Sequence, residues 1–251
     1  KEVFDNLKAD FGFNLHDQGR DYSAGTSFNP ASISFLAPSP DFEKSLTGPR
    51  EKAMKLIGNM VNVLNEFIPG HIGKYSDDYE PRAFGDNFTK WGTGVVLLES
   101  GGWRGDREKQ YLRKINYIAL LSALNSIASG SYANTDLSVY ESIPQNEKFM
   151  MDLILRNLKI KRDNIEYVVD IGINFDEVNV NGAKDFYLKA EIEDVGDLSV
   201  FAGYEEFDLS GYTVNPGKTK PGQYHSLDEL ERMDPIQLYR EGCTNVILNN
   251  D

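Results

Sequence analysis

Two stretches in the first half of the chain have the hydrophobic pattern of β-strands. From Phe11 to Leu15, hydrophobic residues alternate with small or polar ones, which predicts a strand ending at His16. Val95–Leu98 is a run of four consecutive apolar residues, which is typical of a strand buried on both faces of a sheet. Glu99 follows that run directly, so each predicted strand ends at an ionisable residue.

Two other stretches have helical spacing. Apolar residues recur every three or four positions from about Pro49 to Ile68, and Pro69-Gly70 ends that pattern. A second and longer helix is predicted after Asp106, whose carboxylate can cap it, and Gly130 is suited to end it.

The remaining stretches of this half are irregular. Gln18–Pro40 is rich in Gly, Pro, Ser and Asn and is expected to be a loop, and His71–Trp91 has no clear period. The order strand, loop, helix, loop, strand, helix predicts that residues 1–130 form an α/β domain, part of a mixed sheet flanked by helices.

The pattern changes after Gly130. Residues 131–149 are polar and are expected to form a linker. Residues 150–251 contain short β-rich segments separated by glycines, which predicts a small antiparallel β domain. The expected strands and helix of this domain are Leu153–Ile160, Tyr167–Ile173, Phe186–Ile192, Leu198–Phe201, a helix at Leu227–Leu238 and a last strand at Asn245–Leu248.

The charge distribution supports this division and excludes some partners. Residues 150–251 carry 10 basic and 20 acidic residues, a net charge of −10, whereas residues 1–149 carry 16 basic and 19 acidic residues, a net charge of −3. The total charge of −13 would repel phosphate backbones, so nucleic acid is not an expected partner. No apolar run is long enough for a membrane-spanning helix. The single cysteine, Cys243, is expected to be a buried structural thiol.

His16 and Glu99 are the candidates for chemistry. Ligands of open α/β sheets bind at the carboxyl ends of strands, where both residues are expected. A neutral histidine nitrogen there can bind a metal, and a carboxylate leaving an apolar strand can act as a general base. Position alone also allows a hydrogen-bonded structural histidine and a solvated glutamate at the rim.

Two segments carry a family resemblance: Phe11-Gly-Phe-Asn-Leu-His-Asp-Gln18 and Gly94-Val-Val-Leu-Leu-Glu-Ser-Gly-Gly102. They resemble the second half of the catalytic domain of zinc carboxypeptidases of the carboxypeptidase A type, over about residues 1–130. The resemblance implies that His16 is the third zinc ligand and that Glu99 is the catalytic base, acting on a peptide substrate. Tyr75 or Tyr79 is expected to contact the substrate. Asp17 and Gln18 can orient the second ring nitrogen of His16 or line the pocket, although simple loop hydrogen bonding is the favoured role for these two.

One departure from the family is large. The His-x-x-Glu motif that supplies the first two zinc ligands is absent from residues 1–251. We therefore expect the chain to be a fragment of a longer zinc peptidase, inactive and without zinc by itself, and prone to dimerise or to associate with the missing N-terminal part. The alternative is a noncatalytic protein that binds a glycan or a protein partner on a degenerate peptidase-like scaffold.

Overall fold

The computed structural model describes residues 1–162, 165–180, 186–214, 224–225 and 245–249. The chain divides into two compact units, Lys1–Phe149 and Met150–Asp251, and each is described by itself. Residues 131–149, expected to be a linker, belong to the first unit. The expected helix at Leu227–Leu238 and Cys243 lie outside the described residues.

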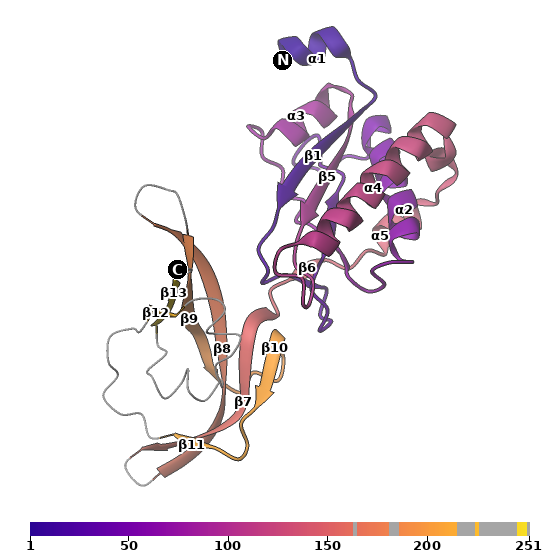
Figure 1. Cartoon of the computed structure of the whole chain (residues 1–251). Coiled ribbons are helices and arrows are strands. Elements are labelled where there is room, and N and C mark those ends of the chain that lie inside the picture. Colours follow the sequence, from indigo (N-terminus) through magenta and orange to yellow (C-terminus); the bar gives the residue numbers. More distant parts are fainter. Residues whose placement is uncertain (163–164, 181–185, 215–223, 226–244, 250–251) are drawn as a thin grey trace. The chain divides into compact units, whose positions relative to one another are not determined.

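The first unit is built on a four-stranded mixed sheet with the order β1-β5-β3-β4 (Figure 1). β1 and β5 are parallel, β3 is antiparallel to β5, and β4 is parallel to β3. The bounds of the strands are Phe11–Asp17 for β1, Ile33–Leu36 for β3, Ile72–Lys74 for β4 and Gly94–Ser100 for β5. The predictions of the first and last of these strands are confirmed. The expectation of a loop over residues 18–40 is wrong for β3, which pairs on both sides within the sheet, and β4 lies in the stretch 71–91 that has no clear period.

Helices α2 (Gly48–Leu64) and α4 (Gln110–Ser129) bury their apolar sides against one face of the sheet (Figure 1). The core contains alternate residues of the central strands together with helix residues: Ile33, Phe35, Val96, Leu98, Leu56, Ile57, Met60, Leu64, Ile115 and Ala119. The N-cap residue of α4 is Lys109 and not Asp106, but the Asp106 carboxylate still accepts hydrogen bonds from the backbone N–H groups of Gln110 at 2.8 Å and Leu112 at 2.9 Å in the first turn. Gly130 ends α4 with a φ of 73°.

Smaller elements complete the unit. α3 (Phe84–Trp91) lies on the opposite face of the sheet, and α1 (Glu2–Leu7) reaches it through a ring contact between Phe4 and Phe88. The short helices η1 (Ser131–Asn134) and α5 (Leu137–Glu141) pack on α2. The two-residue strands β2 (Ser23–Ala24) and β6 (Asn146–Glu147) pair with each other, so the expected linker is folded back onto the loop after β1.

The second unit is a mixed sheet with the order β10-β7-β8-β9-β13-β12, with β11 also paired to β7 (Figure 1). The expectation of an antiparallel domain is correct for β7, β8, β9 and β13 but wrong for β10, β11 and β12, which join the sheet by parallel pairing. The bounds are Met150–Arg162 for β7, Ile165–Asn179 for β8, Phe186–Gly196 for β9, Ala202–Asp208 for β10, Thr213–Val214 for β11, Tyr224–His225 for β12 and Asn245–Asn249 for β13.

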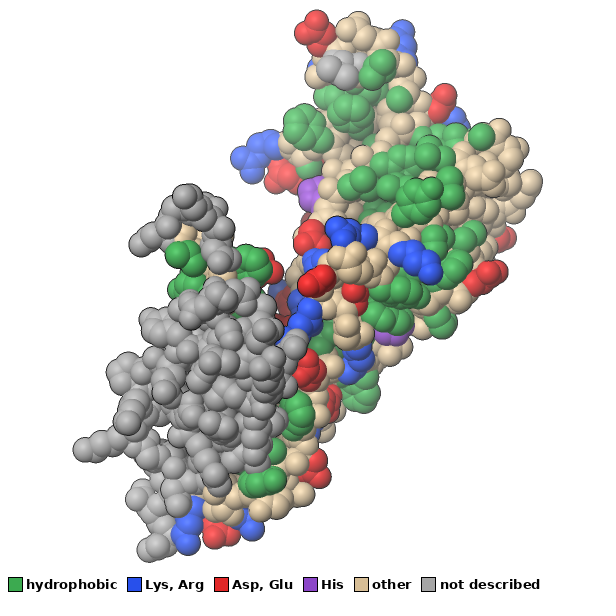
Figure 2. All heavy atoms as spheres, in the orientation of Figure 1, with side chains coloured by type: hydrophobic (Ala, Val, Ile, Leu, Met, Phe, Trp, Pro, Cys, Tyr) green, Lys and Arg blue, Asp and Glu red, His purple; other side chains and the backbone are tan. Residues whose placement is uncertain are grey.

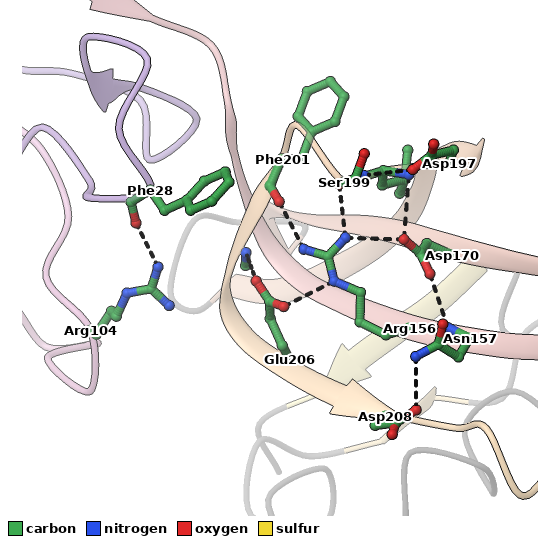
Figure 3. A network of polar contacts seen from close by, with 12 residues as sticks. Phe28, Arg104, Arg156, Asn157, Asp170, Asp197, Ser199, Phe201, Glu206 and Asp208 are labelled. Carbon is green, nitrogen blue, oxygen red and sulfur yellow. Dashed lines mark hydrogen bonds and ion pairs between the residues drawn. The ribbon is translucent and has the colours of Figure 1, made fainter.

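Arg156 shows why β10 is parallel to β7. Residues 197–201, which include the expected strand Leu198–Phe201, instead form the connection that brings the chain from β9 to the outer side of β7. The Arg156 guanidinium donates hydrogen bonds to the carbonyls of Leu198 and Phe201, both at 2.8 Å, and pairs with Asp170 and Glu206 (Figure 3). The Arg156 side chain of β7 therefore holds residues 197–201 against the sheet.

Candidate active site

The strand register places four residues in one row across the first sheet. His16 of β1 is opposite Glu99 of β5, Glu99 is opposite Ser34 of β3, and Ser34 is opposite Gly73 of β4. Side chains alternate between the two faces of a strand, and the residues flanking Glu99 and Ser34 point into the core beneath α2 and α4. The row therefore lies on the face away from those helices, and it brings the two residues singled out in the sequence together.

Glu99 is largely buried, but its carboxylate oxygens keep contact with solvent. The residue is 5% exposed, and neither oxygen is among the fully buried side-chain atoms that lack a hydrogen-bond partner in the described part of the chain. Burial raises the pKa of Glu99, the nearby His16 opposes this shift, and the charge of Asp17 adds to it. A carboxylate in such surroundings accepts a proton more readily than an exposed one.

His16 is more exposed and is held by its own strand. Its Nε2 atom lies 3.0 Å from Oδ1 of Asn14, two residues earlier and on the same face of β1. Asn14 was not singled out in the sequence, although its spacing from His16 on a predicted strand already implied a shared face.

A buried cluster of Gln18, Ser34 and Asn146 adjoins the row. The Gln18 Nε2 group donates to the Ala31 carbonyl at 2.7 Å and to Ser34 Oγ at 3.0 Å, and its Oε1 accepts from Asn146 Nδ2 at 3.1 Å. Asn146 Nδ2 also lies 2.9 Å from Ser34 Oγ. Both polar atoms of the Gln18 carboxamide thus form hydrogen bonds within the protein. This is the structural role that the sequence favoured. Sequence reasoning missed Ser34 and Asn146 because 112 residues separate them.

Gly73 leaves the space that Asn146 fills. A Cβ atom added at Gly73 would lie 1.9 Å from Asn146 Oδ1 and 3.1 Å from Ser34 Oγ. The carboxamide from β6 therefore occupies the place of a side chain in the fourth position of the row.

The other predicted residues separate into two groups. Asp17 forms an ion pair with Lys109, with oxygen–nitrogen distances of 2.6 and 2.7 Å, and this contact ties the end of β1 to the start of α4. The ring of Tyr79 packs against the ring of Phe42, with 4.8 Å between the two ring centroids. Tyr75 directly follows β4, and its backbone N–H donates to the Phe35 carbonyl of β3 at 2.9 Å. Burial first and then the charge of Glu99 raise the pKa of its phenol.

The described residues do not fit a catalytic zinc on their own. Such a site needs three protein ligands and a water, whereas the row offers one histidine and one carboxylate. No group of three or more His, Cys, Asp or Glu side chains suited to a metal occurs in the described ranges.

The fold and row define a mixed α/β protein with a histidine–carboxylate pair at the carboxyl ends of two parallel strands. Comparisons with protein-family models, with curated proteins and with solved structures found no match. Among the described residues, no helix is long and apolar enough to cross a membrane.

Proposed function

We propose that the chain carries the general base and one metal ligand of a peptidase of the zinc carboxypeptidase type. The proposal assigns a role to three residues: Glu99 is the general base, His16 is the metal ligand and Tyr75 is the tyrosine that contacts the substrate. The single observation that supports it best is the position of Glu99, a largely buried carboxylate in direct register with His16. Partial removal of a carboxylate from water costs free energy of folding, which a role in chemistry explains.

The chemistry assigned to Glu99 is proton transfer. A Glu99 oxygen takes a proton from a water molecule as the water oxygen attacks the carbonyl carbon of a peptide bond. The carbon–nitrogen bond then breaks, and the proton passes from Glu99 to the leaving amine. The raised pKa of Glu99 favours the first transfer, because the carboxylate then accepts a proton more readily, and the protonated carboxyl group is the donor for the second.

Zinc, when bound in this family, polarises the carbonyl and activates the water. His16 would supply one ligand to it, and the other ligands would have to come from residues outside the described part of the chain. The proposal therefore concerns a longer protein that includes these 251 residues, and no step above is assigned to the metal.

The test uses the gene product extended upstream of Lys1, purified with zinc and assayed on a series of blocked peptides. Replacing Glu99 by glutamine (E99Q) keeps the size and the hydrogen-bonding oxygen but removes the base. We expect turnover to fall by roughly 10² to 10⁴, the usual contribution of a general base. The matched control is Glu66→Gln, the same chemical change at an exposed position just after α2.

The outcomes distinguish the two functional classes. Near-normal turnover in E99Q would remove Glu99 from the mechanism. If the extended protein has no His-x-x-Glu motif and cleaves none of the peptides, the noncatalytic binding protein is the better description.

A further inference from the structure

Asn14 and His16 form the one contact in the row that involves a histidine ring nitrogen. The two side chains are two residues apart on β1, and Nε2 of His16 lies 3.0 Å from Oδ1 of Asn14. An amide oxygen accepts hydrogen bonds and does not donate them, so the Nε2 atom in this contact must carry the proton.

We infer that Asn14 is a positioning residue that holds neutral His16 in the Nε2–H form and leaves Nδ1 as the nitrogen with the free electron pair. The use of that nitrogen in hydrolysis rests on the proposed function, whereas the choice of nitrogen rests on the contact with Asn14 alone. A neutral imidazole has one donor and one acceptor nitrogen, and a partner on one of them determines which is which.

The consequence concerns what His16 can bind. With Nε2 occupied by Asn14, the neutral ring has a single acceptor, Nδ1, for a bound group. That group is a hydrogen-bond donor such as water or a peptide N–H, or an electron-pair acceptor. A ring without Asn14 would offer either nitrogen and would rotate between two orientations.

The chain contains an internal reference for the opposite form. Nδ1 of His71 lies 3.0 Å from the backbone carbonyl of Pro30, which can only accept, so His71 must be in the Nδ1–H form. Burial lowers the pKa of His71, which keeps this ring neutral near neutral pH. The two histidines should therefore give opposite patterns in the same spectrum.

The test is nitrogen-15 NMR of the histidine rings in the 251-residue chain at mildly alkaline pH, with single substitutions to assign the three histidines. We expect His16 to show the Nε2–H pattern with an N–H proton that exchanges slowly enough to be seen, and His71 to show the Nδ1–H pattern. Asn14→Asp keeps an acceptor oxygen and should preserve the His16 signals. Asn14→Leu removes it, and should lose the visible N–H and change the ratio of the two forms by roughly two- to ten-fold.

Each outcome bears on Asn14 independently of hydrolysis. An Nδ1–H pattern for His16 in the unmodified chain, or an Asn14→Leu spectrum identical to that of the unmodified chain, would overturn the inference. Because the spectrum is recorded without substrate or metal, a failed peptidase assay would leave this result unchanged, and the reverse also holds.

Discussion

At the scale of single residues, the first unit treats its buried charges in two ways. Arg50 is almost fully buried and is fully compensated, since it pairs with Asp77 at 2.6 Å and donates to the Ala37 carbonyl at 3.2 Å. Asp77 accepts a further hydrogen bond from Ser39 at 2.7 Å. Glu99 is 5% exposed, and its carboxylate oxygens reach solvent instead of partners of this kind. A group that costs stability in this way is typical of positions selected for chemistry.

The effect of Glu99 on the free energy of unfolding should depend on pH. Its pKa is raised in the folded protein, mainly by burial, from the ordinary value of 4.5. Above pH 4.5 the unfolded chain loses this proton more readily than the folded chain, so the carboxyl group lowers the free energy of unfolding as the pH rises through the folded-state pKa. Below pH 4.5 both states are protonated and the effect disappears.

E99Q should therefore stabilise the 251-residue chain at neutral pH. We expect the free energy of unfolding of E99Q to exceed that of the unmodified chain at pH 7, and the difference to shrink as the pH falls toward 4. Urea unfolding of both proteins across this pH range measures the difference. A constant difference at every pH would mean that the Glu99 carboxyl does not titrate differently in the folded and unfolded states.

At the scale of elements, the sequence pattern predicted the helices and strands whose formation depends mainly on local interactions. β1, β5, α2 and α4 were found in the sequence because each has a repeated apolar face, and the start of α4 because Asp106 is close to the amides that donate to its carboxylate. β3 and β4 are too short to show a period, and their burial depends on neighbours from elsewhere in the chain. The pair His16–Glu99 was predicted from strand ends, but Ser34 and Asn146 join it through register and through β6, which the sequence does not reveal.

The contact between Gln18 and Asn146 should be measurable as a coupling between β6 and the end of β1. Replacing either by alanine leaves buried amide or hydroxyl groups without partners, and we expect each change to cost about 1–3 kcal/mol. The double substitution should cost less than the sum, by about 0.5–3 kcal/mol, because both remove the same hydrogen bond. A double-mutant cycle from chemical unfolding gives this number, and strict additivity would contradict the cluster.

The second unit offers a parallel test at Arg156. The side chains of Arg156 and Asp170 are 19% and 15% exposed, so Arg156→Met removes the cation that pairs with a largely buried carboxylate and the guanidinium donor to two backbone carbonyls. We expect a loss of about 2–3 kcal/mol in the stability of this unit. Lys161→Met is the control, since Lys161 is 47% exposed and lies 3.9 Å from Glu166. Equal effects of the two substitutions would show that Arg156 does not hold the connection 197–201.

At the scale of the whole molecule, the two units differ in architecture and in charge. The first combines helices with a four-stranded sheet and contains the row of site residues, whereas the second is a mixed β-sheet that carries a net charge of −10 over residues 150–251. The composition predicted this division, because charge and periodicity are properties of long stretches. The parallel strands of the second unit were missed, because strand direction depends on how the chain returns to the sheet.

The 251-residue chain should bind no stoichiometric zinc. His16 is a single ligand, and a histidine with one neighbouring carboxylate holds zinc poorly compared with a site of three ligands. Elemental analysis after dialysis against zinc measures the content directly. One tightly bound zinc per chain, lost in His16→Ala, would show that residues outside the described ranges complete the site.

Gly73 and Asn146 have a consequence for reading other sequences. A side chain on residue 73 would displace the carboxamide that reaches over it from residue 146, because the added Cβ would lie 1.9 Å from Asn146 Oδ1 and Asn146 would have to turn away from Ser34 and Gln18. The residue types at the two positions should therefore change together, although β5 and α4 both lie between them in the sequence. In any set of homologous chains, glycine at the first position and asparagine at the second should be inherited or lost as a pair, which makes the pair a marker that strand-end motifs alone do not provide.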